Sequence, residues 1–115
     1  MPLPLSSTMT SARLIMTTAG SEVEAERLAS ALVAERLAAC VNVVGPIQSH
    51  YWWRDQPETA TEHLLLIKTT AEAVERVGER IRSIHSYELP EFIVLNLESG
   101  DAQYLAWIAG SVRKP

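Results

Sequence analysis

The sequence predicts a single domain of the α+β class, in which helices and strands alternate except for one directly joined pair of strands. Three observations support this prediction. The chain has 115 residues, which is the size of one average domain. Short apolar runs of strand length alternate with segments of helical periodicity. Turn-forming residues such as glycine and proline separate many of these segments.

The chain begins with a predicted buried strand and an amphipathic helix. The run ARLIMTTA, residues 12–19, is short, mostly apolar and followed by Gly20, which is typical of a strand covered on both faces. Ser21 and Glu24 have the spacing of a capping box at the start of a helix. Apolar residues then recur at helical spacing, which predicts a helix over residues 22–36.

A long β-hairpin is predicted for the middle of the chain. Small and β-branched residues followed by aromatic ones predict one strand over residues 39–54, kinked or bulged at Gly45 and Pro46. The polar stretch DQPETAT, residues 55–61, is predicted to form the turn. The return strand is then EHLLLIK, residues 62–68.

The C-terminal part contains a second helix, a strand and a final helix. Thr69 and Glu72 have the spacing of another capping box before a predicted helix over residues 71–85. FIVLNLE, residues 92–98, is typical of a buried strand. Asp101 is a suitable N-cap for the last helix.

This order of elements restricts the topology. Parallel strands need right-handed helical crossovers, whereas the central pair is joined by a turn. The result is a split βαβ, or ferredoxin-like, sheet with helices on one face and an extra C-terminal helix. Two helices cannot cover the long hairpin, and an uncovered apolar face usually means self-association. We expect residues 1–10 to form a flexible tail and residues 11–115 to form the domain.

Composition excludes several classes of function. Ten basic and 14 acidic residues give a net charge of −4, without the basic patch that nucleic-acid binding requires. The single cysteine, Cys40, excludes an intrachain disulfide and indicates a reducing compartment. The first ten residues lack the positive charge and the apolar run typical of a signal peptide, and no apolar run approaches membrane-spanning length. We therefore expect a cytoplasmic protein without nucleic-acid or membrane partners.

No catalytic motif is recognisable in the sequence. It lacks the G-x-S-x-G nucleophile elbow, the phosphate-binding loop and the H-E-x-x-H helix. A nucleophilic Cys40 would need the fold to bring a histidine to an exposed thiol. Core packing of Cys40 is the alternative, because free cysteine is among the most buried residue types. We therefore expect a protein that is not an enzyme.

Five segments of the chain together resemble the CutA divalent-cation-tolerance family. They are residues 35–42 (ERLAACVN), the set Ser49, Tyr51 and Trp53, residues 62–69, residues 85–91, and residues 104–108 (YLAWI). Each motif is weak alone, but their order is specific. The resemblance implies a ferredoxin-like subunit in a homotrimer, similar to the nitrogen-regulatory signalling trimers. It also implies a link to copper and other divalent cations, with no established enzymatic activity.

The residues and the resemblance differ over metal binding. Copper-binding members of the family have a cysteine where this chain has Thr17, and two successive histidines where it has Ile84 and His85. Only His85 remains, whereas copper favours several imidazole or thiolate ligands. We expect weak binding of copper or another divalent metal at His85 and no obligatory cofactor. The alternative is that His85 complements the dipole at a helix end.

Another set of residues points to a small-ligand site. Lys68 ends a strand, where open sheets place ligands. Together with Glu62, Tyr87 and Glu91 it would suit a small anion in clefts between subunits, and the link to metal would then be indirect. A salt bridge from Lys68 to either glutamate is the alternative.

Aromatic residues are expected to anchor the assembly. Tyr51 and Trp53 share one face of a strand, and Trp52 faces the other way. Large aromatic side chains on a sheet with an uncovered face are typical interface anchors. We predict that Tyr51, Trp53 and Trp107 lie at the subunit interface.

Overall fold

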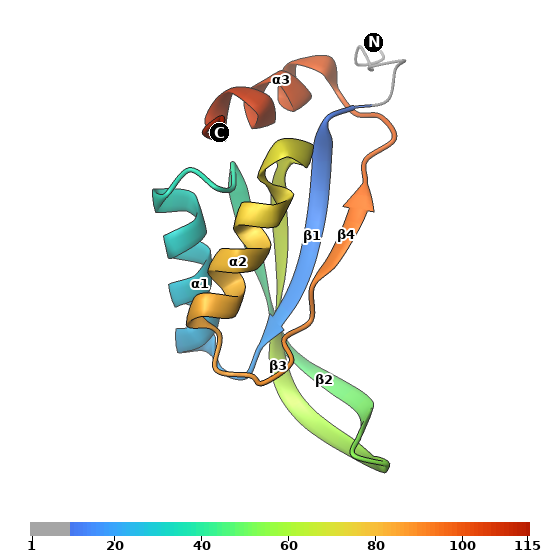
Figure 1. Cartoon of the computed structure of the whole chain (residues 1–115). Helices are drawn as coiled ribbons and strands as arrows, with labels where there is room; N and C mark the ends of the chain where they lie inside the picture. Colours follow the sequence, from blue (N-terminus) through green and yellow to red (C-terminus); the bar gives the residue numbers. More distant parts are fainter. Residues whose placement is uncertain (1–9) are drawn as a thin grey trace.

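The computed structural model describes residues 10–115 and confirms the predicted ferredoxin-like α+β fold (Figure 1). Four strands form one antiparallel sheet in the order β2-β3-β1-β4. The elements are β1 (Ala12–Ala19), α1 (Glu22–Ala34), β2 (Cys40–Trp53), β3 (Gln56–Thr70), the short 3-10 helix η1 (Ala71–Ala73), α2 (Val74–Ile84), β4 (Ile93–Asn96) and α3 (Ala102–Ser111). Helices α1 and α2 cover one face of the sheet, and α3 crosses the end where β1 begins and β3 ends (Figure 1).

The hydrophobic core lies between the sheet and helices α1 and α2. Its largest buried side chains are Ile15, Leu65 and Ile67 from the strands, Leu28 and Leu32 from α1, and Val77 and Ile81 from α2. Burial of one such side chain stabilises the fold by about 1.5–3 kcal/mol. Because side chains alternate along a strand, the residues of β3 between these core positions face the open side of the sheet.

The hairpin turn is shorter than predicted. Arg54 and Asp55 alone form it, with φ values of 49° and 63°, as a two-residue type I′ turn requires. The prediction of a turn over residues 55–61 is therefore wrong beyond its first residue, because β3 already begins at Gln56. Pro57 pairs opposite Trp52. Proline has no backbone N–H to donate, and it is tolerated here because β3 has a partner strand on only one side in this part of the hairpin. The ribbon projects beyond the helices (Figure 1).

The predicted irregularity at Gly45 and Pro46 is confirmed. The pairing of β2 with β3 shifts register between Val44 and Ile47, as in a β-bulge. A side chain at position 45 would clash, because its Cβ would come within 2.6 Å of the His63 ring. Glycine is therefore needed here for the close approach of the two strands.

Two of the predicted helix caps are confirmed. The Ser21 side chain accepts the Glu24 N–H at 3.1 Å, at the start of α1. Asp101 accepts the Tyr104 N–H at 2.9 Å, at the start of α3. Each satisfies one backbone donor that has no partner within the helix.

Two predictions about chain segments next to strands are wrong. The Thr69 hydroxyl does not cap a helix but donates to the buried Leu37 carbonyl at 2.7 Å, because Thr69 faces the core. Thr10 does not belong to a tail, since its hydroxyl donates to the Leu97 carbonyl at 2.6 Å. Residues 1–9 of the predicted tail lie outside the described residues.

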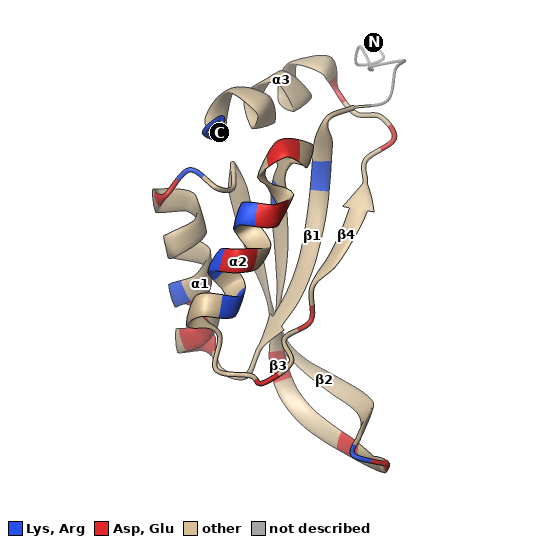
Figure 2. Cartoon of the chain, in the orientation of Figure 1, with Lys and Arg blue, Asp and Glu red and all other residues tan. Residues whose placement is uncertain are grey.

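The other face of the sheet and the edge strand β4 remain uncovered. Ile93, Val94 and Leu95 of β4 are between 39% and 49% exposed. Charged side chains gather on α1, α2 and the hairpin turn (Figure 2), whereas β4 and α3 contain none. Within residues 10–115, no helix has both the length and the apolar character needed to cross a bilayer.

Candidate functional site

A cleft of about 760 Å³ lies between the projecting hairpin and the segment that joins α2 to β4. We call residues 85–92 the α2–β4 segment. The strands contribute Thr18, Ser49, His50, Tyr51, Trp53 and Glu62 to the lining, and residues 87–93 complete it. The cleft is therefore built from parts of the chain that lie far apart in sequence.

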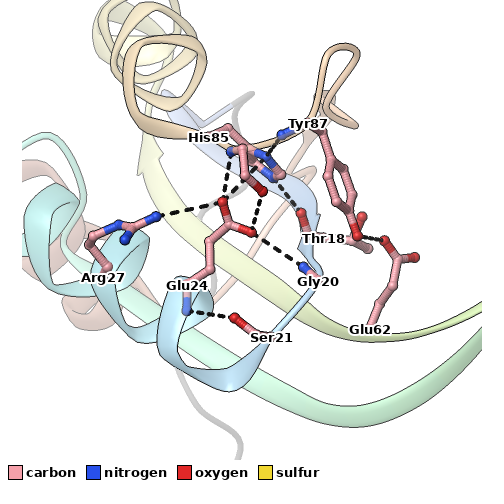
Figure 3. Close-up of polar contacts among 9 residues, drawn as sticks. Thr18, Gly20, Ser21, Glu24, Arg27, Glu62, His85 and Tyr87 are labelled. Atoms are coloured by element: carbon pink, nitrogen blue, oxygen red, sulfur yellow. Dashed lines mark hydrogen bonds and ion pairs between the residues drawn. The ribbon is translucent and has the colours of Figure 1, made fainter.

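Tyr87 and Glu62 meet across this cleft. The Tyr87 hydroxyl donates to Glu62 Oε2 at 2.7 Å (Figure 3). Glu62 is only 7% exposed. Burial, together with the hydrogen bond to Glu62, raises the pKa of Tyr87. The phenol therefore stays protonated even well above neutral pH and serves as a hydrogen-bond donor to Glu62.

Glu91 lies in the same cleft. Burial and the negative charge of Glu62 raise the pKa of Glu91. Among the described residues, no lysine or arginine lines the cleft. Glu62, Tyr87 and Glu91 therefore come together as expected, but in acidic surroundings.

Lys68 does not lie with them in the single subunit. Its Nζ donates to the Tyr104 hydroxyl at 3.3 Å, and it stands 5.6 Å from the centre of that ring. Lys68 is six residues along β3 from Glu62, a separation of about 20 Å in an extended strand. The predicted anion site and the alternative salt bridges to Glu62 or Glu91 are therefore not formed within one subunit.

His85 is fully buried rather than available to a metal. Its side chain is 0% exposed, and its Nδ1 accepts the Tyr87 N–H at 3.0 Å. Because a backbone N–H can only donate, Nδ1 carries no hydrogen and Nε2 donates to the Thr18 carbonyl at 2.7 Å. Both ring nitrogens are occupied, so a metal could bind His85 only if the ring left these partners, and its metal-ligand role stays a prediction. His85 instead fixes the end of α2 against β1.

Glu24 supports the site, although its spacing from Ser21 indicated only a helix cap. Its carboxylate oxygens accept the Ser86 N–H at 2.7 Å and the Ser86 hydroxyl at 2.9 Å. Burial alone would raise its pKa, but the hydrogen bonds from the Ser86 N–H and hydroxyl and from the Gly20 N–H outweigh burial, and the pKa of Glu24 is lowered. No local pattern signals this contact, because 62 residues separate the partners.

Metal-ligating side chains do not cluster elsewhere in the described chain. No group of three or more histidine, cysteine, aspartate or glutamate residues in residues 10–115 could hold a metal ion. Cys40 is partly exposed, and its sulfur lies 3.8 Å from the side-chain oxygen of Asn42. The Cys40 side chain is therefore not fully buried in the core, as the packing interpretation would require. Among the described residues, no histidine forms a hydrogen bond with its thiol.

The three predicted interface residues are all at the surface. Tyr51 and Trp53 are 43% and 38% exposed, against 75% for Trp52. Trp107 lies in α3, with its ring centre 5.4 Å from that of Tyr104. Their role in an interface stays a prediction.

Comparisons with known proteins agree with one another. The family model described as CutA1 divalent ion tolerance protein matches residues 13–111. The divalent-cation tolerance protein CutA of Thermus thermophilus is 41% identical over 83% of this chain and 92% of its own length. The chloroplastic protein CutA 1 of Oryza sativa is 37% identical over 88% of this chain, which spans 57% of that longer protein. The crystal structure of CutA1 from Oryza sativa has a TM-score of 0.89 at 36% identity, covering 95% of this chain and 100% of that one.

Proposed function

The chain belongs to the CutA1 divalent ion tolerance protein family, and from this premise we propose that it acts in divalent-cation tolerance as a non-catalytic homotrimer that binds a small ligand in its acidic cleft. The observation that carries the ligand role is the convergence of Glu62, Tyr87 and Glu91 on one cleft of about 760 Å³. Small-molecule sites have volumes in this range, with a few polar groups among apolar walls.

The proposed trimer is supported by the uncharged, uncovered surfaces of the subunit. The edge strand β4 exposes three apolar side chains and has no charged residue to discourage pairing with another chain. Helix α3 is likewise uncharged and exposes Trp107. Burial of these surfaces against other copies would remove apolar area from water.

We propose that the link to metal is mainly indirect. Direct copper or other divalent-metal binding would be weak, because His85 is occupied by Thr18 and Tyr87 and copper favours several nitrogen or sulfur ligands. The ligand cleft, rather than a metal centre, would then connect the protein to the response to metal ions, and we propose that it does so in the cytoplasm.

A non-catalytic role fits the chemistry of the cleft. The Tyr87 hydroxyl already donates its proton to Glu62 at 2.7 Å, and burial and Glu62 raise the pKa of Tyr87 further, so Tyr87 favours hydrogen bonding over nucleophilic attack. The competing hypothesis is an enzyme that uses Cys40. Rapid native thiol labelling of Cys40, with loss of a measured activity, would support that hypothesis instead.

The experiment that tests the proposed function is native mass spectrometry of the purified assembly. We expect the mass of a trimer, a retained small molecule and no stoichiometric copper. One copper ion per subunit that survives gel filtration would contradict the indirect link to metal. A monomer would contradict the assembly.

A further inference from the structure

Two acidic side chains lie under surfaces that we have assigned to contact between copies of the chain. Glu62 and Glu91 line the cleft together with Tyr51, Trp53 and Ile93. The two aromatic residues, and strand β4 with Ile93, belong to the proposed interface. A second copy that covers these walls would therefore also enclose the two carboxyl groups.

The negative charge of these two groups is not compensated within the subunit. Arg54 contacts the third carboxylate of the cleft, Glu88, at 3.2 Å, where both side chains are 73% exposed. Such an exposed pair contributes little. Among residues 10–115, no lysine or arginine forms an ion pair with Glu62 or Glu91. Enclosing two like charges without a cation would be costly.

The facing surfaces of a second copy are poor in cations. Strand β4 and helix α3 contain no charged residue. Lys68 lies on the open face of the sheet, but its Nζ already donates to the Tyr104 hydroxyl at 3.3 Å and stands over that ring. A proton is the alternative to a cation, because protonation removes the charge of a carboxylate that loses contact with water.

The geometry of the cleft directs this proton to Glu91. The Tyr87 hydroxyl donates to Glu62 Oε2 at 2.7 Å (Figure 3), and a hydrogen bond to a carboxylate favours its charged form. Glu91 has no such donor among the described residues, and burial and the charge of Glu62 raise its pKa. The pair can therefore hold one proton, on Glu91, and carry one negative charge instead of two.

We propose that the contact between copies responds to pH, because Glu91 takes up a proton when a second copy covers the cleft. Acidification then strengthens the assembly, and alkaline pH weakens it. The proposal rests on the homotrimer of the proposed function but needs no bound ligand. Its sign follows from burial. Assembly withdraws Glu91 further from water and raises its pKa again, so the association constant falls as the pH rises through the raised value.

The test is fluorescence-detected sedimentation of the full chain, labelled at its N-terminal amine, in dilution series at pH 5 and pH 8. We expect the association constant of the wild type to be about tenfold or more higher at pH 5. Glu91→Gln keeps the shape of the side chain without its charge. This variant should assemble at pH 8 about as tightly as the wild type does at pH 5, and lose most of the pH dependence.

Two control variants should keep the pH dependence of the wild type. Glu79→Gln, at an exposed position of α2, is the matched control for removing a glutamate charge. His50→Gln is needed because a histidine can also gain a proton between pH 8 and pH 5, and His50 lines the cleft. The remaining titratable groups that face the cleft are Tyr51, Tyr87 and Glu88.

A second measurement covers an assembly that is too tight to dissociate on dilution. Carbon-13 NMR of the glutamate carboxyl groups follows their titration in the intact assembly, and the Glu91→Gln variant identifies the Glu91 signal. A pKa of Glu91 above the ordinary glutamate value supports the proposal. An ordinary or lowered value overturns it.

The other outcomes separate the proposal from the proposed function. Assembly that weakens on acidification, with a weaker Glu91→Gln assembly at pH 8, would show that a cation such as Lys68 of a second copy pairs with Glu91, and the proposal would be wrong. It would also be wrong if His50→Gln, but not Glu91→Gln, abolished the pH dependence. A trimer without any pH dependence overturns this proposal alone, whereas a chain that is monomeric at every pH overturns the proposed homotrimer with it.

Discussion

Ser86 donates two hydrogen bonds to Glu24, from its N–H to Oε2 at 2.7 Å and from its hydroxyl to Oε1 at 2.9 Å. This pair binds the α2–β4 segment to the first turn of α1 (Figure 3). Tyr87, the next residue, reaches across to Glu62. One buried carboxylate on a rigid helix therefore positions a residue of the cleft, although Glu24 itself does not line it.

Glu24→Gln should destabilise the fold in a pH-dependent way. The pKa of Glu24 is lowered by folding, so its contribution is present above the ordinary glutamate pKa and is lost as the pH falls through the lowered value. We expect the free energy of unfolding at pH 7 to fall by about 1–3 kcal/mol. The difference from the wild type should shrink below about pH 4. Urea unfolding at both pH values measures it, with the exposed Glu22→Gln of the same helical turn as control.

Glu91→Gln should have the opposite sign. Burial and the charge of Glu62 raise the pKa of Glu91, so folding favours its protonated form. That contribution is present below the ordinary glutamate pKa and is lost as the pH rises through the raised value. The glutamine variant should therefore be more stable than the wild type at pH 7 and equal to it near pH 3. A loss of stability at pH 7 would contradict the raised pKa.

Two buried threonines of the core face should respond differently to replacement by valine. The Thr69 hydroxyl donates to the Leu37 carbonyl at 2.7 Å, so Thr69→Val should cost about 1–3 kcal/mol by leaving that carbonyl unpaired. The Thr17 hydroxyl is buried and has no partner among residues 10–115. Thr17→Val should therefore be neutral or stabilising by about 1 kcal/mol. Urea unfolding of the two variants checks the contrast, and equal losses would contradict it.

The assembly should depend on one face of the hairpin. Light scattering is expected to give about three times the subunit mass of 12.7 kDa. Tyr51→Ala or Trp53→Ala should shift the equilibrium toward monomers more than Trp52→Ala, because positions 51 and 53 share a face. Trp52 is the matched control, being 75% exposed in the subunit. Equal effects of all three replacements would place the interface elsewhere.

Copper(II) should bind no tighter than the micromolar range in a calorimetric titration. His85→Ala is expected to leave that affinity within about threefold, because both ring nitrogens are already hydrogen-bonded. The same variant should lower the melting temperature, since the Thr18 carbonyl and the Tyr87 N–H lose their partner at a cost of about 1–3 kcal/mol for each buried group. A nanomolar site abolished by His85→Ala would show that the ring leaves these partners to bind metal.

The sequence by itself determined the order and the type of the elements. Strands and helices follow from side-chain periodicity, and two helix starts follow from capping residues within three positions of their partners. The bulge at Gly45 and Pro46 was visible for the same reason, since these residues disturb a strand wherever they occur. Each of these signals acts over a few residues of the chain.

Only the tertiary structure decided what the chemically active side chains touch. Thr69 matched a capping box, but the strand directs its hydroxyl to Leu37 in the core. The sequence left His85 either as a metal ligand or as a side chain that complements the dipole at a helix end, yet the folded chain buries it and joins its ring to Thr18 of β1. The convergence of Tyr87 and Glu91 on Glu62 rather than on Lys68 depends on the folded chain, and the Glu24–Ser86 contact spans 62 residues. Such contacts form because a buried polar group needs a hydrogen-bond partner, and the folded chain can supply that partner from any distance along the sequence. Partners of this kind follow no regular spacing, so no sequence pattern predicts them.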